Sequence, residues 1–247
     1  FLRKMLRSGA ASLYGFPTAL YGTLLPAPMI GRRCEGQIRS VAAAGHETGV
    51  HAWDHVAWHD GLAQWPAGKV REHVERLHAE YRRILGSPAQ ASAAAGWTAN
   101  ALSLEAEAER QPALLFTSNT RLGPPFFPSA GGRRFATLEI PTTLPTLDET
   151  LAWEALPTEE AQRAFFRGAV KGTEVHTIHT EVEGRSKRRL FEAILDAWRE
   201  DGVRFTTLGD LAAEALARRE DVPVRELVTT ALPGRAGKVA TGWPPAA

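Results

Sequence analysis

The sequence predicts an α/β fold, and two observations support that class. Short apolar or β-branched runs alternate with stretches of helical spacing along most of the 247 residues. The links between them are short, which favours a parallel sheet with crossover helices, and a β/α barrel is the closed form of such a sheet. In these folds the functional groups lie at the C-terminal ends of the strands.

The first 31 residues combine basic and apolar side chains with Gly, Pro and aromatic residues. Their start could be an amphipathic helix, either on a membrane surface or packed on the domain. Residues 34–44 are expected to form a helix that ends at Gly45, and residues 46–51 are expected to form a short strand.

A long amphipathic helix is expected at residues 67–85. Its apolar positions are four, three, four and three residues apart: Val70, Val74, Leu77, Tyr81 and Ile84. This spacing places them on one helix face, and Gly86 ends the helix. His73 and His78 are assigned to the polar sectors of this helix, so they are expected at the surface.

The remaining elements follow the same logic. Strands are expected where apolar or β-branched residues run together, at residues 89–94, 113–118, 137–140, 175–179 and 203–206. Helices are expected at residues 102–110, 159–170 and 186–201, and the T-x-x-D form of residues 207–210 marks another helix start. Residues 121–134, rich in Pro and Gly, are expected to form a loop. The tail from Pro233 onward is expected to be disordered.

Composition and motifs exclude several functional classes. Lys plus Arg number 29 and Asp plus Glu 28, so a net charge of +1 gives no signal for nucleic acid. Cys34 is the single cysteine, which rules out an internal disulfide and fits a reducing cytoplasm. No apolar stretch approaches the roughly 18 residues needed to span a bilayer. The sequence has no G-x-S-x-G, Walker A or dinucleotide-binding motif.

Four of the eight histidines lie between residues 46 and 59. His51 and His55 are four residues apart, so on one helical turn their imidazoles project from the same face and can bind one cation. The metalloprotease motif H-E-x-x-H is absent, because the histidine after Glu47 comes one position too late. His46 is therefore interpreted as a structural residue at the start of a strand.

A second histidine pair lies on the predicted strand at residues 175–179. His176 and His179 are three residues apart, so they should point to opposite faces, and only one can reach a site. His179 ends this strand, and His51, Trp97 and Asn119 also lie at or just past predicted strand ends. Agreement across four elements predicts a common site at that edge.

The segment GHETGVHAWDH resembles the second motif of the NodB-homology polysaccharide deacetylases. The closer resemblance is to one branch of that family, the ArnD-type 4-deoxy-4-formamido-L-arabinose-phosphoundecaprenol deformylases. It runs from Phe1 to about Leu216, and the segments that carry it are KMLRSGAASLYG, VAAAGHETGVHAWDH, SAAAGW, IPTTLPTLDE and VHTIHTEVEG. The resemblance implies a distorted β/α barrel domain over residues 1–216. Residues 217–247 are expected to be a partly disordered extension.

The resemblance also implies roles for individual residues. His51 and His55 would bind a divalent metal cation, such as Zn, Mn, Co or Ni, and His179 would be the general acid for the departing amine. The residues implied to contact the substrate are Trp97, Arg121 and Glu181.

The implied activity is metal-dependent removal of the formyl group from undecaprenyl-phosphate-linked 4-formamido-4-deoxy-L-arabinose at the cytoplasmic face of the bacterial inner membrane. The bound cation would polarise the formyl oxygen and lower the pKa of water. The freed amine is later placed on lipid A, where it weakens binding of polymyxin-like cationic peptides. Two alternatives remain open: a polysaccharide or peptidoglycan N-deacetylase, and a non-catalytic membrane-surface binding protein derived from the enzyme.

Two departures from the family pattern affect these expectations. Asn119 stands where the resemblance predicts an aspartate that partners the catalytic histidine. Family members also begin with a strand that carries paired aspartates, one a metal ligand and the other the general base. The sequence contains no such strand, so the chain is expected to lack the first strands of the barrel and, as written, to be inactive.

Overall fold

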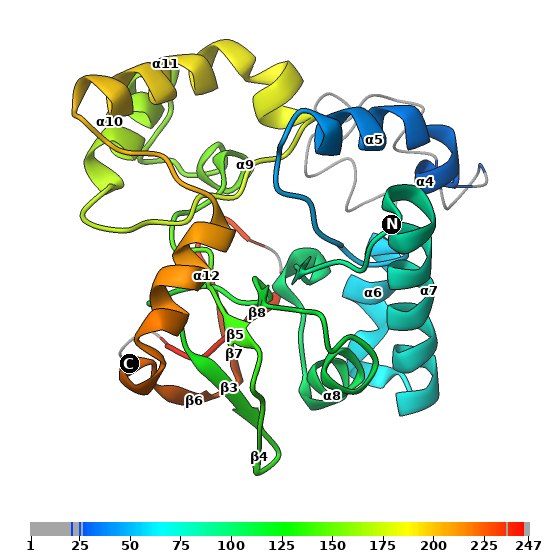
Figure 1. The fold of residues 1–247 in the computed structure, drawn as a ribbon. Helices are drawn as coiled ribbons and strands as arrows, with labels where there is room; N and C mark the ends of the chain where they lie inside the picture. The colour runs from blue at the N-terminus through cyan, green and yellow to red at the C-terminus, as the bar shows by residue number, and fades with distance from the viewer. Residues whose placement is uncertain (1–20, 22–24, 26, 236, 245–247) are drawn as a thin grey trace. The chain divides into compact units, whose positions relative to one another are not determined.

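The computed structural model describes residues 21, 25, 27–235 and 237–244 (Figure 1). The fold is a mixed α/β fold that divides into two compact units. Unit 1 comprises Phe1–Arg33 and Leu144–Arg204, and unit 2 comprises Cys34–Thr143 and Phe205–Ala247. The amphipathic helix expected at the start of the chain lies outside the described residues.

Unit 2 contains the parallel sheet that the sequence predicts. Its strands, in the order in which they pair, are β1 (Ala91–Ser92), β2 (Phe116–Thr117) and β5 (Leu138–Glu139). The strand expected at residues 46–51 is reduced to a single parallel bridge between Val50 and Ser92. Gly49 is needed beside this bridge, because a Cβ there would lie 2.8 Å from the carbonyl oxygen of Ala91.

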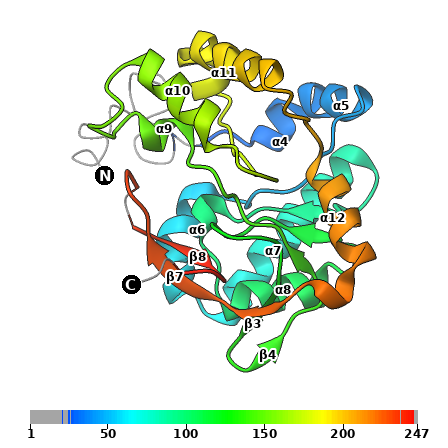
Figure 2. The same cartoon turned by 90° about the vertical axis from the view of Figure 1, so that its left-hand side faces the viewer.

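Two further small sheets complete the strands of unit 2. Their members are β3 (Phe127–Ala130), β4 (Arg133–Arg134) and β6 (Val224–Glu226) in one sheet, and β7 (Val228–Ala231) and β8 (Lys238–Thr241) in the other (Figure 2). The expectation of a loop at residues 121–134 is therefore wrong in part, and disorder from Pro233 onward is wrong for β8. Among the described residues each sheet has two or three strands, and none closes into a barrel.

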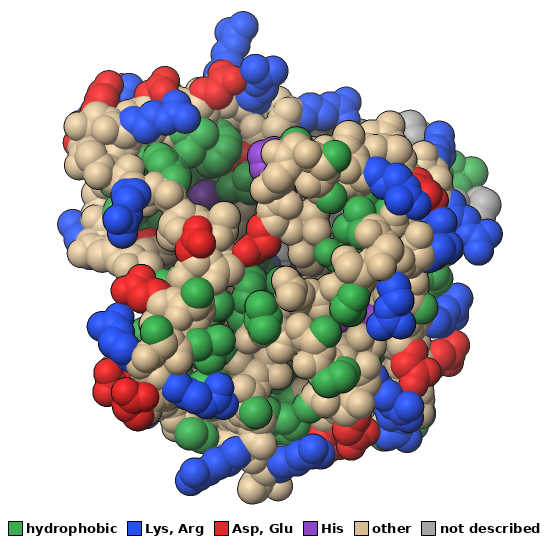
Figure 3. Space-filling view, in the orientation of Figure 1, with side chains coloured by type: hydrophobic (Ala, Val, Ile, Leu, Met, Phe, Trp, Pro, Cys, Tyr) green, Lys and Arg blue, Asp and Glu red, His purple; other side chains and the backbone are tan. Residues whose placement is uncertain are grey.

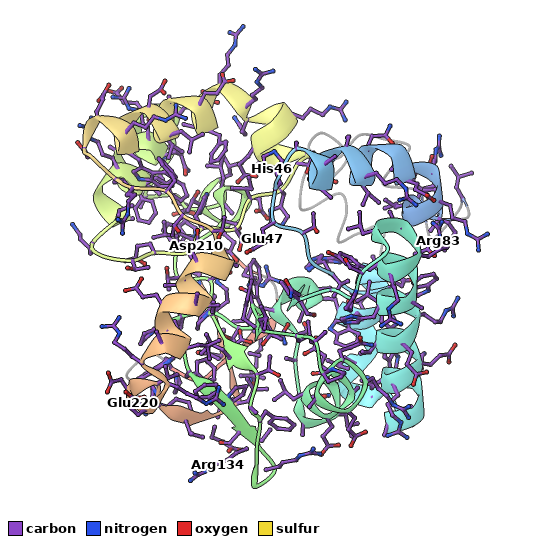
Figure 4. The ribbon with its side chains drawn as sticks, viewed as in Figure 1. His46, Glu47, Arg83, Arg134, Asp210 and Glu220 are labelled. Atoms are coloured by element: carbon purple, nitrogen blue, oxygen red, sulfur yellow. The ribbon has the colours of Figure 1, made fainter. Side chains whose placement is uncertain are left out.

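The rest of the described part of unit 2 includes its helices. They are α5 (Glu35–Ala43), α6 (His55–Gly61), η1 (Leu62–Gln64), α7 (Ala67–Leu85), η2 (Ala95–Trp97), α8 (Ala101–Arg110), α12 (Leu208–Ala217) and η4 (Arg219–Asp221). The expected bounds of the long helix are confirmed. The chain also begins α12 as expected, since the Thr207 side chain accepts a hydrogen bond from the backbone N–H of Asp210. Figure 4 shows Glu47 beside this helix start, where its Oε2 accepts from the N–H of Gly209 at 2.8 Å.

The histidines of α7 are buried, so their expected place at the surface is wrong. His73 is 7% exposed and His78 is 1% exposed. Both follow the spacing of the apolar face, because His73 lies three residues after Val70 and His78 lies four residues after Val74. The apolar core beside them contains Trp58, Leu62, Val70, Val74, Ala95 and Ala106.

Unit 1 is helical in its described part. Its elements are α4 (Ile30–Arg33), α9 (Leu147–Thr150), α10 (Glu159–Ala169), the π-helical turn η3 (Val182–Ser186) and α11 (Arg188–Glu200). Its core contains Leu144, Leu147, Phe166, Val182, Leu190, Ile194 and Trp198. Residues 175–179 and 203–206 do not form strands, so the two strands expected there are wrong.

The described surface carries charges of both signs. Figure 3 shows Lys and Arg side chains interspersed with Asp and Glu over the visible face. None of the helices in the described part of the chain is long and apolar enough to cross a membrane.

Candidate functional site

His51 follows the bridge between Val50 and Ser92, at the C-terminal edge of the parallel sheet. The backbone there is fixed by two hydrogen bonds, from Val50 N to Ala91 O at 3.0 Å and from Ala93 N to Val50 O at 2.9 Å. His51 Nδ1 lies 2.9 Å from the carbonyl oxygen of Ala93. Because a carbonyl oxygen only accepts, Nδ1 carries the proton and the lone pair of the ring is on Nε2.

His55 is the first residue of α6. Asp54 caps this helix by accepting a hydrogen bond from the N–H of Ala57 at 2.9 Å. The ring centroids of His51 and His55 are 5.2 Å apart, and the rings are inclined by 56°. Two imidazoles that share a tetrahedral cation at roughly 2.0–2.1 Å per nitrogen place their ring centroids about 5 Å apart. The pair therefore has a separation that a shared cation allows.

The pair has no third metal ligand among the residues that the structure describes. No cluster of three or more His, Cys, Asp or Glu side chains in that part of the chain could hold a metal ion. The nearby carboxylates of Asp54 and Asp60 have other partners: Asp54 caps α6, and Asp60 lies 2.8 Å from Nδ1 of His59. Two imidazoles alone fall short of the three protein ligands typical of catalytic zinc sites.

Trp97 and Arg121 also lie at this edge of unit 2. The indole N–H of Trp97 donates to Oγ1 of Thr142 at 3.1 Å, and the Arg121 guanidinium lies 4.5 Å from the ring centroid. Arg121 is 2% exposed, and its backbone N–H donates to the carbonyl oxygen of Ala240 in β8 at 2.9 Å. Arg235 adds a second guanidinium at 4.7 Å from the same indole. The C-terminal segment thus helps to hold Trp97 and Arg121, two of the three residues that were expected to contact substrate.

Asn119 lies in a buried polar network with Glu107 and Glu139. Its backbone N–H donates to Oε1 of Glu139 at 2.7 Å, and its side-chain amide donates to Oε2 of Glu107 at 3.1 Å. Oε2 of Glu139 accepts a further bond from the Thr117 hydroxyl at 2.6 Å. Burial raises the pKa of Glu139 to about 7 and also raises the pKa of Glu107. The side-chain amide of Asn119 therefore supplies a donor to the Glu107 carboxyl, and its backbone N–H supplies one to the Glu139 carboxyl.

The acidic partner of His179 is Asp148, in unit 1. Nδ1 of His179 lies 3.3 Å from Oδ1 of Asp148, and both side chains are about two-thirds buried, at 34% and 28% exposed. The Asp148 carboxylate raises the pKa of His179 against the opposing effect of burial. Burial would raise the pKa of Asp148, but its interactions with His179 and Thr146 and with a backbone N–H together outweigh this, and the pKa is lowered. Because Nδ1 faces the carboxylate, Nε2 is the nitrogen that can donate a proton to a substrate.

The backbone of His179 is also held in place. Its N–H donates to Oε2 of Glu183 at 2.7 Å, and its carbonyl oxygen accepts from the N–H groups of Val182 and Glu183, each at 2.9 Å. The charge of Glu181, a residue expected to contact substrate, also raises the pKa of His179. His176 turns instead into an aromatic cluster, with its ring centroid 5.1 Å from that of Phe166. His179 and the His51–His55 pair belong to different units, so their alignment stays a prediction.

Comparisons with known proteins identify the family. No family model matches the chain. A probable 4-deoxy-4-formamido-L-arabinose-phosphoundecaprenol deformylase, ArnD, from Shewanella sediminis (strain HAW-EB3) is 32% identical over 240 residues, which are 96% of this chain and 75% of the relative. The protein of the same name from Wigglesworthia glossinidia brevipalpis is 30% identical over 243 residues, 97% of this chain and 82% of the relative. The chain belongs to this deformylase family.

The fold is similar to those of solved polysaccharide deacetylases. A Mycobacterium smegmatis structure described as a polysaccharide deacetylase matches with a TM-score of 0.63 and 21% identity, over 83% of this chain and 75% of that chain. A probable polysaccharide deacetylase from Pseudomonas aeruginosa PAO1 matches with a TM-score of 0.57 and 19% identity, over 77% of this chain and 65% of that chain. At these identities the likeness concerns the fold.

Asp148 is the site residue that sequence reasoning missed. It lies in the segment IPTTLPTLDE, which carries part of the family resemblance. A local signal was present, because Thr146 and Glu149 have the spacing of a capping box and form one at the start of α9. That signal predicts a helix start with Asp148 in its first turn. It does not predict contact with a histidine 31 positions later in the chain.

Proposed function

We propose that this chain hydrolyses the formamide of undecaprenyl-phosphate-linked 4-formamido-4-deoxy-L-arabinose, giving formate and the free 4-amino sugar. The observation that carries the proposal is the similarity to the two deformylases, which covers at least 96% of the chain and therefore both units. The released amine would then be placed on lipid A, where its positive charge weakens the binding of polymyxin-like cationic peptides.

We further propose that His51 and His55 bind a divalent cation through their ring nitrogens. The support is the 5.2 Å separation of their rings and the contact between Nδ1 of His51 and the carbonyl oxygen of Ala93, which places the lone pair of the ring on Nε2. A cation held there would polarise the formyl oxygen and lower the pKa of water. Imidazole nitrogen binds Zn, Mn, Co and Ni with differing affinity, and two imidazole ligands do not distinguish among these four metals.

His179 is the proposed general acid. Hydrolysis adds water to the formyl carbon and breaks the C–N bond, and the departing nitrogen takes a proton from Nε2 of His179. The amine is a poor leaving group until it is protonated, so the acid must still hold its proton near neutral pH. The carboxylate of Asp148 favours that form, because it raises the pKa of His179.

The substrate also implies where in the cell the protein works. An undecaprenol chain resides in a membrane, so we propose a peripheral protein at the cytoplasmic face of the bacterial inner membrane. Trp97, Arg121 and Glu181 remain the proposed substrate contacts. The proposed scaffold is a distorted β/α barrel of the NodB-homology type.

The test is formate release from the lipid-linked formamido sugar by the complete gene product, with and without a chelator. We expect formate from this substrate, loss of activity on chelation, and no acetate from N-acetylated glycans. Acetate release from those glycans without formate release would favour the N-deacetylase alternative. Tight binding of the lipid-linked sugar without either product would favour the non-catalytic binding protein.

A further inference from the structure

The loop between His51 and His55 adopts a conformation that its sequence does not favour. Ala52 has φ +58°, in the left-handed region that side chains with a Cβ rarely occupy. Residues 52–54, which we call the ligand loop, connect the bridge at Val50 to the start of α6. A strained loop keeps one conformation only where surrounding groups hold it.

His73 holds this loop through one ring nitrogen. Its Nε2 accepts hydrogen bonds from the backbone N–H groups of two consecutive residues, Trp53 at 2.9 Å and Asp54 at 3.1 Å. A nitrogen that accepts must carry a lone pair, so the ring is neutral and its proton is on Nδ1. Burial agrees with this state, since it lowers the pKa of His73.

The position of the His73 ring is fixed from the other side. The residue lies inside the 19-residue helix α7, and its ring centroid is 5.1 Å from those of both Trp58 and Trp65. Trp58 is itself held, because its indole N–H donates to the carbonyl oxygen of Thr98 at 2.8 Å. The acceptor nitrogen therefore has little freedom to move. Its two hydrogen bonds hold the ligand loop at a fixed position relative to α7.

We infer that His73 is a positioning residue: by accepting both ligand-loop N–H groups, it sets the separation of the His51 and His55 imidazoles and thereby the affinity of the pair for a divalent cation. This inference rests on the cation of the proposed function, but its test needs no deformylase activity. Residues that orient metal ligands through hydrogen bonds typically change metal affinity about 10- to 100-fold when they are replaced.

Three substitutions separate the acceptor from the bulk of the ring. In His73→Gln, Oε1 is the same number of bonds from Cα as Nε2 of histidine, so it can accept both N–H groups. In His73→Asn, the acceptor Oδ1 is one bond short, and His73→Leu has no acceptor. Ile84→Val, a buried substitution at the far end of α7, is the matched control for general destabilisation.

Two readouts are measured on the whole chain. The first is the Co²⁺ dissociation constant, followed by the visible absorption of the bound ion. The second is the exchange rate of the Trp53 and Asp54 amide protons without metal. We expect His73→Leu and His73→Asn to weaken Co²⁺ binding about 10-fold or more and to lose amide protection. His73→Gln and Ile84→Val should stay within about 3-fold of the wild type in affinity, well inside the range that such orienting groups control.

Several results would overturn the inference. One is wild-type affinity and protection in a folded His73→Leu chain. If that variant does not fold, equal Co²⁺ affinity and equal amide protection in His73→Gln and His73→Asn would also contradict the inference. A wild-type chain that takes up no Co²⁺ would instead contradict the cation site of the proposed function, and amide exchange would still decide whether His73 holds the ligand loop.

Discussion

Replacing Asn119 by aspartate exchanges one amide group for an oxygen and barely changes the size of the side chain. The change removes the donor that lies 3.1 Å from Oε2 of Glu107 and adds a third carboxyl beside Glu107 and Glu139. If residue 119 partnered His179, as the family resemblance suggested, Asn119→Asp should raise activity. The buried network predicts a loss of stability instead.

The expected loss can be worked from the burial of the site. Asn119 is 2% exposed, so a new charge there would repel the neighbouring carboxyls with little screening. The folded protein avoids this by keeping the new carboxyl protonated, and protonating an ordinary aspartate at pH 7 costs about 4 kcal/mol. A protonated carboxyl can again donate to Glu107, so the lost hydrogen bond adds little. We therefore expect a loss of about 3–4 kcal/mol at pH 7.

The pH dependence has a definite sign. The new carboxyl has a folded-state pKa above its unfolded value, so its destabilising effect is nearly absent below about pH 4 and grows as the pH rises. Urea denaturation of Asn119→Asp and the wild type at pH 4.5 and pH 7.5 measures this. Asn100→Asp is the matched control, because Asn100 caps α8 as an acceptor and a carboxylate keeps that role, losing only the 3.4 Å bond from Nδ2 to the carbonyl oxygen of Leu62. Wild-type stability at pH 7.5, or an equal loss at both pH values, would refute the network.

Three further predictions concern the site. In Asp148→Asn, the pKa of His179 should fall because the carboxylate that raises it is gone, so the alkaline limb of the formate-release profile should move to lower pH; an unmoved limb would count against the pair. His51→Ala and His55→Ala should each abolish stoichiometric Co²⁺ uptake without loss of helical circular dichroism, since both side chains are exposed, and retained uptake would contradict the ligand assignment. The 247-residue chain should release formate about 10² times or more slowly than a version extended by a segment with paired aspartates, because the described residues supply no third ligand. Equal rates would place the catalytic carboxylates within this chain.

Helical spacing predicted the bounds and the apolar face of α7, and the same spacing places its two histidines on that buried face. Val70 and Val74 define the buried face, and His73 and His78 lie on it by position. Their polarity placed them at the surface in the prediction. A neutral imidazole can be buried where it has packing or a hydrogen-bond partner, and the N–H groups of the ligand loop supply that partner to His73.

Turn chemistry explains one strand pair that the prediction missed. Gly131 and Gly132 have φ +58° and +80°, and they join β3 and β4 as a two-residue hairpin turn. A Gly-Gly pair between short extended segments indicates such a hairpin, but the surrounding Pro and Gly residues favoured a loop. The opposite error occurred at residues 175–179, where a β-branched run predicts a strand but the backbone forms none, because β-propensity depends strongly on tertiary context.

A sequence reveals the residues that carry the chemistry of a site more readily than the residues that orient them. His51, Trp97 and Asn119 could be brought together because each follows a parallel strand or bridge, and parallel strands end at one edge. The position of a residue at a strand end can be predicted from residue type and local spacing alone. His73 orients the ligand loop from another element, and Asp148 faces His179 across 31 positions of chain, so both depend on tertiary contacts. At Asn119 the strand-end argument gave the location, but not the contacts with Glu107 and Glu139, because the neighbours of a strand end come from distant segments.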